Sequence, residues 1–338
     1  MTDLADVADV AATPVLEVRD LVQRFKVGRR HLEAVAGVSF DIRAGETLGL
    51  VGESGCGKSS TGRAVLQMPR PASGSVRLAG RELTELSGDA LKSARRRMQL
   101  IFQDPVSSLN PRRRVREIVG EGLTIAGADR TEIDARVESM LSLVGLDASL
   151  IGDRRAHQLS GGQCQRVAIA RALAVQPEVL ICDEPVASLD VSIQGQVLNI
   201  LEDMRRTFGL AMLFISHDLS VVHNVSDRIA VMYLGRIVEI GPSVAITHAP
   251  RHHYTRALLD SVPAADPAVE ADDRLLEGEI PSPLDPPSGC RFRGRCPAAT
   301  QRCADEEPPL AELDNGRLVA CHFPLPAEVP VAVGPQSA

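Results

Sequence analysis

Short apolar runs alternate with helix-like segments along most of the chain from Val15 onward. Thr47–Val51 is a continuous apolar run, and Val179–Cys182 and Met212–Ile215 have the same character. Val38–Ile42 instead alternates apolar and polar positions, as a half-buried strand does. Helical segments over 166–175 and 193–207 separate such runs. The pattern predicts buried parallel strands layered with helices, which is an α/β domain.

The pattern changes between about residues 104 and 158, where β-type runs stop. Apolar residues there recur at helical spacing on one face, and Gly145 follows as a helix-ending signal: Ile133, Val137, Met140, Leu141 and Val144. We predict a helical subdomain inserted into the α/β core.

After residue 255 the composition changes again. Prolines and acids are frequent over 263–289, which indicates an extended or loop-rich segment. Four cysteines follow. We divide the chain into a disordered N-terminus (1–13), an α/β domain (14–255), a cysteine-containing extension (256–326) and a flexible tail (327–338).

Composition restricts the class of protein. Of 338 residues, 44% are hydrophobic and 24% charged, as in ordinary soluble proteins, and without tryptophan the core must be aliphatic. A net charge of −7 argues against a nucleic-acid binder, so we expect no nucleic-acid partner. The arginine runs 95–97 and 112–114 are interpreted as solvated faces.

Two further absences in the sequence bear on location. No stretch approaches the ~20 apolar residues that span a bilayer, and the N-terminus lacks the basic region of a signal peptide. We therefore expect a protein kept in the cytosol, where its seven cysteines would not form structural disulfides.

Residues 52–59, GESGCGKS, match the phosphate-loop pattern G-x-x-x-x-G-K-[ST] between a predicted strand and a predicted helix. Glycines let backbone amides turn toward phosphates, Lys58 can reach the β- and γ-phosphates, and the Ser59 hydroxyl can bind Mg²⁺. The residues expected to hold the nucleotide are Gly52, Ser54, Gly55, Cys56, Gly57, Lys58, Ser59 and Ser60.

Cys56 within this loop has two interpretations. The favoured one is a small side chain that fills space. The alternative is a redox switch, because a helix N-terminus can lower the pKa of a thiol.

Two acids follow a buried strand, at the edge of a parallel sheet where ligands bind. Asp183 can hold Mg²⁺, and Glu184 can polarise the attacking water as a general base.

Upstream, Leu159–Gln163 reads LSGGQ ahead of a helix predicted to begin near Cys164. Ser160 is a suitable N-cap, and the two glycines allow close approach of an anion. The sequence therefore predicts a second phosphate-binding helix start.

These motifs in this order, with Ser188-Leu189-Asp190 and an apolar strand ending at His217, resemble the ATP-binding-cassette (ABC) ATPases. The resemblance implies that Ser160, Gly161, Gly162 and Gln163 contact ATP held by a partner subunit and that Asp190 is a dimer contact. It also implies that Gln103 reaches Mg²⁺ and water and faces a permease. His217 would touch the γ-phosphate, and Phe25, before the first long strand, would stack on adenine.

Longer strings narrow the resemblance to the ATP-binding subunits of oligopeptide/dipeptide importers, over about residues 15–325. They are GETLGLVGESGCGKS from residue 45, FQDP and SSLNP from residues 102 and 107, CDEPV from 182 and LDVSIQ from 189. One departure is His253, where that family usually has proline.

The resemblance implies a P-loop ABC ATPase fold with a parallel-sheet core, an antiparallel β subdomain and the inserted helical subdomain. The implied partners are a second ATPase subunit, identical or paralogous, two transmembrane permeases and an extracytoplasmic substrate-binding protein. The implied place is the cytoplasmic face of the inner membrane. Close relatives also serve nickel or glycosides. A soluble ABC ATPase of DNA repair or translation is a further alternative, but its coiled coil or tandem cassettes are not seen in this sequence.

The late cysteines are Cys290, Cys296, Cys303 and Cys321. Four thiolates in a short, poorly apolar segment indicate a metal-ligand set. The family resemblance favours a 4Fe–4S cluster. Zn²⁺ is the competing metal, although its ligand pairs are usually closer in sequence, and free thiols are the third possibility. His322 is a candidate substitute ligand.

Overall fold

The computed structural model describes residues 13–187, 189–261, 279–314 and 316–327. The predicted disordered N-terminus except Thr13, most of the proline-rich segment and the tail from residue 328 lie outside these residues. The chain divides into two compact units, one of residues 1–17, 41–47 and 76–215 and the other of residues 18–40, 48–75 and 216–338. Within the described ranges, no helix has the length and apolar character needed to cross a membrane.

A parallel sheet lies at the centre of the first unit. Its strands are β6 (Met98–Ile101), β7 (Val179–Asp183) and β8 (Ala211–Ser216), with β7 in the middle. All residues of β7 and β8 are buried. The apolar runs predicted as buried parallel strands are thus confirmed, because a strand covered on both faces needs apolar side chains at every position.

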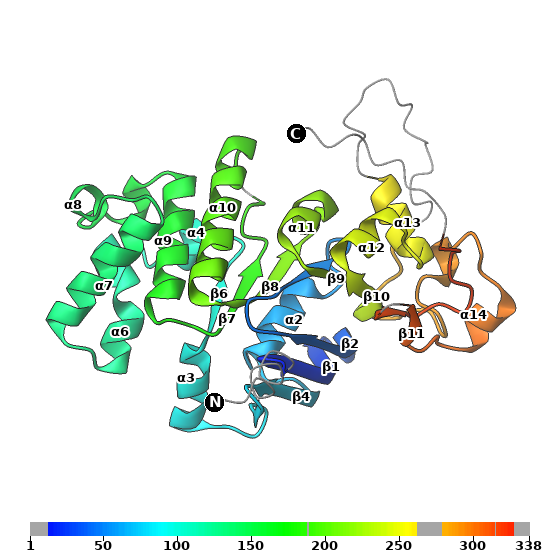
Figure 1. Cartoon of the computed structure of the whole chain (residues 1–338). Coiled ribbons are helices and arrows are strands. Elements are labelled where there is room, and N and C mark those ends of the chain that lie inside the picture. The colour runs from blue at the N-terminus through cyan, green and yellow to red at the C-terminus, as the bar shows by residue number, and fades with distance from the viewer. Residues whose placement is uncertain (1–12, 188, 262–278, 315, 328–338) are drawn as a thin grey trace, which may run out of the picture. The chain divides into compact units, whose positions relative to one another are not determined.

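Helices of the first unit gather around α9 (Gly161–Ala174), against which α7 (Arg130–Leu143) packs (Figure 1). The predicted apolar face of α7 is confirmed by burial of Val137, Met140 and Leu141. The helix predicted over 193–207 is α10 (Val191–Phe208). The remaining elements are β4 (Ser73–Leu78), β5 (Arg81–Glu82), α3 (Gly88–Arg96), α4 (Pro105–Ser108), α5 (Val115–Val119), α6 (Glu121–Ala126), α8 (Ala148–Ile151) and η1 (Ala156–Gln158).

The second unit contains a mixed sheet. Strand β3 (Thr47–Val51) runs parallel to β9 (Arg228–Tyr233), and β10 (Arg236–Pro242) pairs antiparallel with β9. The C-terminal extension adds β12 (Arg317–Val319) to β10 and then β11 (Ala311–Asp314). The sequence predicted β3 but not this addition, by which the extension becomes part of the same sheet.

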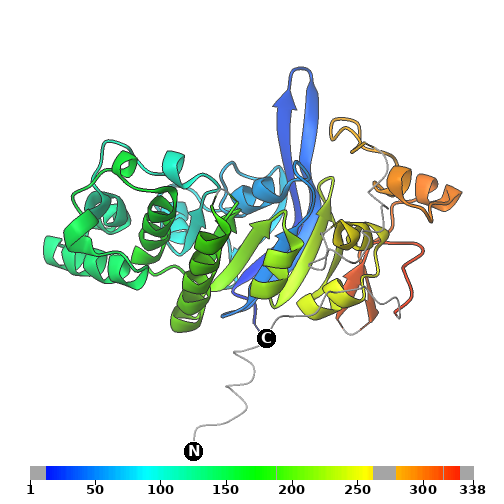
Figure 2. The same cartoon turned by 90° about the horizontal axis from the view of Figure 1, so that it is seen from above.

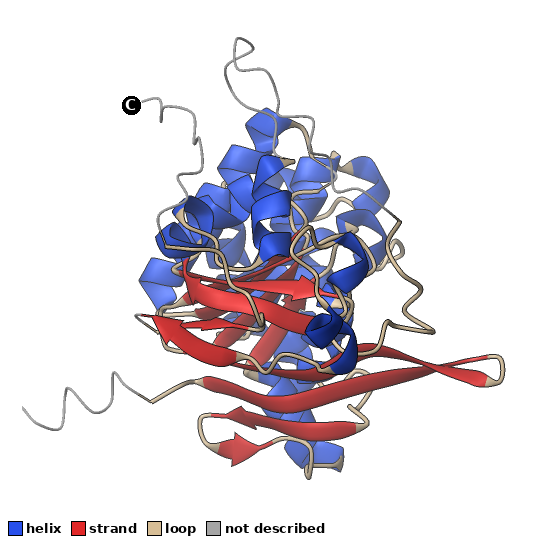
Figure 3. Cartoon of the chain, turned by 90° about the vertical axis from the view of Figure 1, so that its right-hand side faces the viewer, coloured by secondary structure: helices blue, strands red, loops and turns tan. Residues whose placement is uncertain are grey.

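The second unit also contains a long hairpin of β1 (Leu16–Val27) and β2 (Arg30–Ile42) (Figures 2 and 3). The strand predicted over Val38–Ile42 is only the end of β2, because the outer part of the hairpin is too exposed to show strand-like alternation. The other elements are α2 (Lys58–Val65), α11 (Leu219–Val225), α12 (Ser243–His248), α13 (His253–Asp260), η2 (Arg293–Arg295) and α14 (Gln301–Asp305).

An aromatic cluster anchors the extension in the second unit. The ring of Phe292 lies 5.3 Å from that of Tyr233 on β9, 5.4 Å from Tyr254 on α13 and 5.8 Å from His252. Tyr233 and Tyr254 lie 4.6 Å apart. Only 3% of the residues are aromatic, so this packing concentrates them at one junction. Because aromatic pairs add to the gain from burial, the cluster fixes residue 292 firmly to β9 and α13.

His252 makes the stability of this cluster depend on pH. The residue is 2% exposed, and burial, with a smaller effect of His253, lowers its pKa to about 3. The unfolded chain binds this proton near pH 6.5 but the folded chain only near pH 3, so folding stability falls as the pH falls through this window. Acidification to pH 5 should cost about 2 kcal/mol.

We expect His252→Asn to flatten this acid loss. Asparagine keeps a side-chain acceptor for the Tyr254 amide, which His252 Nδ1 now binds at 3.0 Å. The measurement is the free energy of unfolding in urea at pH 5, 6 and 7, with the exposed His31→Asn as the control. Identical slopes in the wild type and His252→Asn would show that His252 does not cause the loss.

Candidate nucleotide-binding site

The predicted phosphate loop wraps tightly ahead of α2. Gly52, Gly55 and Gly57 have positive φ angles of 154°, 79° and 110°. A Cβ on Gly57 would lie 2.1 Å from the carbonyl oxygen of Ala34, so no other residue fits there without a shift of the backbone. Gly57 is also the N-cap of α2. Backbone amides at such a loop and helix start form an anion-binding cradle, so the loop fits a phosphate group.

The cation of this loop is folded back onto the loop itself. Lys58 is 4% exposed, and its ammonium donates to the carbonyl oxygens of Gly52 (2.7 Å) and Glu53 (3.0 Å). Ser54 and Gly55 at the tip are exposed. The tip of the loop is thus exposed, whereas the Lys58 ammonium is buried against carbonyl oxygens of the same loop.

Cys56 behaves as a filler. Its side chain is 5% exposed, and burial raises the pKa of the thiol despite the opposing effect of Lys58. A thiol with a raised pKa is a poor nucleophile at neutral pH. The structure therefore favours the space-filling interpretation over the redox switch.

Two further predicted site residues belong to the second unit. His217 is exposed in the turn between β8 and α11, where Asp218 caps the helix by accepting from the amide of Ser220 at 2.9 Å. Phe25 is half-buried within β1. The expectation that Phe25 precedes the first long strand was wrong, because β1 itself is twelve residues long.

In the first unit, the predicted acids follow β7. Asp183 is its last residue and is 1% exposed. Glu184 has a left-handed φ of 49°, which is strained for a non-glycine residue and typical of functional turns. Its amide donates to Ile215 O (2.9 Å), and Gln103 Nε2 donates to its carboxylate at 2.9 Å. The structure thus brings together two residues that the sequence predicted separately.

The second predicted anion site is a capped helix start. Ser160 Oγ accepts from the amide of Gln163 (3.3 Å), and the Gln163 side chain accepts from the amide of Ser160 (3.0 Å). This capping box starts α9 at Gly161, so the predicted start near Cys164 was wrong by three residues. A Cβ on Gly162 would lie 2.9 Å from Ile193 Cγ2, whereas Gly161 is exposed. Asp190 is the exposed N-cap of α10.

The four late cysteines do not form a metal site in the part of the chain that the structure describes. There, no group of three or more His, Cys, Asp or Glu is arranged to hold an ion. Cys290 donates its amide to Cys303 O at 2.8 Å, and burial raises the pKa of Cys321 to about 11. His322 Nε2 lies 3.1 Å from the carbonyl oxygen of Glu306. The geometry gives the iron–sulfur and zinc predictions no support.

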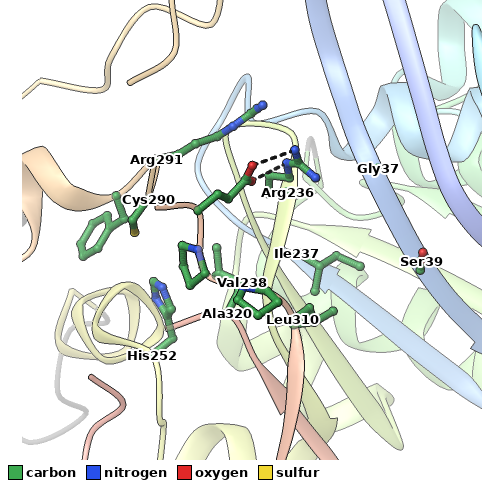
Figure 4. A pocket seen from close by; sticks show the side chains of 14 residues that line it. Gly37, Ser39, Arg236, Ile237, Val238, His252, Cys290, Arg291, Leu310 and Ala320 are labelled. Carbon is green, nitrogen blue, oxygen red and sulfur yellow. Dashed lines mark hydrogen bonds and ion pairs between the residues drawn. The ribbon is translucent and has the colours of Figure 1, made fainter. Parts of the chain in front are cut away.

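Cys290 borders a cavity of about 310 Å³ between the extension and β10 (Figure 4). Arg236 in its wall is paired with Glu307 at 2.9 Å. This ion pair brings two opposite charges together within the wall of the cavity.

Sequence reasoning missed two residues that hold the phosphate loop in place, Tyr254 and Arg295. The amide of Glu53 donates to the Tyr254 hydroxyl at 2.9 Å, and Arg295 binds the Glu53 carboxylate through two nitrogens at 2.8 and 2.9 Å. Arg295 follows Glu53 by 242 residues. No local pattern could have revealed this pair.

Comparison with known proteins agrees with this geometry. The family model for ABC transporters matches residues 35–187, and that for the oligopeptide/dipeptide transporter C-terminal region matches residues 238–303. The oligopeptide transport ATP-binding protein OppF of Escherichia coli is 48% identical over 91% of this chain and 92% of its own length. OppF of Haemophilus influenzae is 45% identical over 91% and 96%.

Solved structures show the same fold. The dimeric post-hydrolysis state of the ATP-binding cassette MJ0796 bound to ADP and Pi has a TM-score of 0.62 and 26% identity, over 68% of this chain and 98% of that chain. The structure of cbiO1 from Clostridium perfringens has a TM-score of 0.61 and 28% identity, over 68% and 89%.

The phosphate loop, the acid pair and the capped second nest thus define a P-loop ABC ATPase. Within this class, the chain belongs to the ATP-binding subunits of oligopeptide/dipeptide ABC transporters.

Proposed function

We propose that this chain binds ATP between its own phosphate loop and the Ser160–Gln163 nest of a second ATPase subunit, and that hydrolysis drives import of oligopeptides or dipeptides. The observation that carries the proposal is the presence of two anion-binding helix starts in one chain, at Gly57 and at Ser160. One nucleotide needs one such cradle, so the second is available to a partner's ATP. The dimeric state of the cassette MJ0796 with ADP and Pi supports this arrangement.

Each site residue then has a chemical role. Lys58 leaves the carbonyl oxygens of its loop and binds the β- and γ-phosphates. Ser59, Gln103 and Asp183 would supply the oxygen ligands that Mg²⁺ prefers, and the metal, when bound, would neutralise charge that develops on the phosphates. Glu184, held by Gln103, accepts a proton from the attacking water, and His217 contacts the γ-phosphate.

The remaining residues contact the adenine ring of ATP and the partner subunits. Phe25 stacks on adenine, and Asp190 contacts the second subunit, which is a copy of this chain or a paralogue. Closure of the pair pulls on two permeases through the exposed region of Gln103. An extracytoplasmic binding protein delivers the cargo, and the chain lies on the cytoplasmic face of the inner membrane. The nucleotide-binding domain spans 14–255, with the helical subdomain at 104–158 and the extension at 256–326.

Uptake measurements test the cargo. We expect cells that lack this chain to lose accumulation of a labelled oligopeptide, because the permeases are driven only when ATP closes the pair of ATPase subunits. The wild-type gene should restore uptake, whereas a Glu184→Gln gene should not. Unchanged peptide uptake together with lost nickel or glycoside uptake would replace the peptide assignment with one of those cargoes. Loss of none of the three would point to a soluble ABC ATPase.

We propose separately that the extension binds a 4Fe–4S cluster through Cys290, Cys296, Cys303 and Cys321. Four thiols of the type that binds iron support this, whereas their arrangement does not form a ready ligand group. Iron and zinc analysis of protein purified without oxygen tests it. Iron with visible absorbance supports the cluster, and zinc supports a Cys₄ site. Absence of both metals would show that the thiols are free.

A further inference from the structure

Glu53 is the residue through which the phosphate loop is attached to the rest of the second unit. Its carbonyl oxygen holds the Lys58 ammonium, its amide donates to the Tyr254 hydroxyl, and its carboxylate binds Arg295. All three polar groups of one loop residue are therefore engaged. Since the Lys58 ammonium rests on Glu53, the position of Glu53 helps to set where the ammonium lies.

The ion pair between Arg295 and Glu53 has a defined geometry. Two nitrogens of the guanidinium bind the two carboxylate oxygens of Glu53, at 2.8 and 2.9 Å. The side chain of Arg295 is 4% exposed and that of Glu53 is 20% exposed. The guanidinium also lies 5.9 Å from the centre of the Tyr233 ring. Paired planar groups that are shielded from water fix both distance and orientation, which an exposed ion pair does not do.

The segment that carries Arg295 is itself fixed. We call residues 290–296 the clamp segment. Its Phe292 packs in the aromatic cluster, and its Arg291 donates to the carbonyl oxygen of Leu234 in the β9–β10 turn. The next residue of that turn, Gly235, donates its amide to the Cys56 carbonyl at 2.7 Å. The clamp segment thus reaches the phosphate loop by two routes, one through Glu53 and one through Cys56.

The open side of the loop also faces the extension. A cavity of about 270 Å³ is lined by Glu53 to Cys56 of the loop, by Tyr233 of β9 and Leu234 of the turn, and by Ile280, Pro281 and Pro283 of the extension. The loop can therefore adjust toward this space when it is not held. A side chain that fixes Glu53 restricts this freedom before the nucleotide arrives.

We infer that Arg295 is a positioning residue for ATP, which holds the phosphate loop through Glu53 in the shape that accepts phosphate. Binding then needs less ordering of the loop, and the C-terminal extension becomes part of the nucleotide-binding machinery. The inference rests on the proposed role of the loop in binding ATP.

Equilibrium binding of a fluorescent ATP analogue to the full-length chain tests it. We expect Arg295→Ala to weaken binding about three- to tenfold and to raise KM by a similar factor, with kcat within about twofold of the wild type. Glu53→Ala should have the same effect, and the double variant should be no weaker than either single variant, because both remove one interaction. Arg295→Lys keeps the charge without the fork and should recover part of the loss.

Arg293→Ala is the matched control. This arginine belongs to the same clamp segment, and its side-chain hydrogen bonds to other described residues stay within the extension, at Ser288 and Ala304. We expect the Arg293→Ala variant to bind the ATP analogue as tightly as the wild type. Affinity within twofold of the wild type for Arg295→Ala would overturn the inference. Equal weakening in Arg293→Ala and Arg295→Ala, with equal losses of Tm, would also overturn it.

A separate variant distinguishes failure of the inference from failure of the proposed function. If Lys58→Met binds the analogue as well as the wild type, the loop does not hold ATP and the proposed function fails. If Lys58→Met loses binding while Arg295→Ala keeps it, the inference alone fails.

Discussion

Replacing Glu184 with glutamine is expected to leave a protein that binds ATP and pairs but turns over about 10²–10⁴-fold more slowly, because it lacks a general base. Glutamine has the same size and can still accept the hydrogen bond from Gln103 Nε2, now 2.9 Å from the carboxylate. It also tolerates the left-handed φ of 49° no worse than glutamate. The change therefore removes the basic carboxylate and little else.

Phosphate release at saturating ATP measures the loss of turnover, and light scattering with and without ATP measures pairing. Glu138→Gln, exposed on α7, is the matched control and should keep wild-type turnover. We expect Glu184→Gln to accumulate as an ATP-bound pair because hydrolysis no longer removes the ligand that favours closure. Wild-type turnover in this variant would show that another group is the base.

Replacing Lys58 with methionine is expected to lower kcat/KM for ATP by about 10²–10³-fold. The ammonium is the buried positive charge of the phosphate loop and rests 2.7 Å from the Gly52 carbonyl oxygen. Methionine keeps most of the aliphatic volume but has no charge with which to bind the phosphates. It also leaves two carbonyl oxygens without their donor, so the thermal midpoint must be measured alongside activity.

Lys92→Met provides the control for charge. Lys92 is exposed on α3 and pairs with the exposed Asp89, an interaction of small expected worth. We expect unchanged activity and unchanged binding. Equal ATP binding by Lys58→Met and the wild type, measured with the fluorescent analogue, would remove the loop from the proposed site.

Local sequence patterns predicted the parts of the fold that local physics determines. The run from Val179 to Cys182 predicted β7 because a strand buried on both faces must be apolar throughout. The phosphate loop was predictable from its motif, because positive φ angles and close contacts require glycines at fixed positions in it. The α9 start was placed too late, since glycine disfavours helix in general. The capping box of Ser160 and Gln163 overrides this preference.

Features that depend on distant residues were not predictable in the same way. The outer part of the β1–β2 hairpin is exposed, so its pattern carries no strand signal. The pairing of β12 with β10 joins Leu318 to Ile240, and the Arg295 contact joins the extension to the phosphate loop. Both follow from tertiary packing, which a single sequence does not encode at fixed spacing.

We propose that one chain carries only half of a working ATPase site, since the Lys58 loop needs the Ser160–Gln163 nest of a second subunit. The most direct test is the ATPase activity of the wild-type chain under dilution at saturating ATP, with the mass followed by light scattering. We expect turnover per chain to fall toward zero as the protein becomes monomeric, although ATP still binds. Undiminished turnover by a species shown to be monomeric would contradict it.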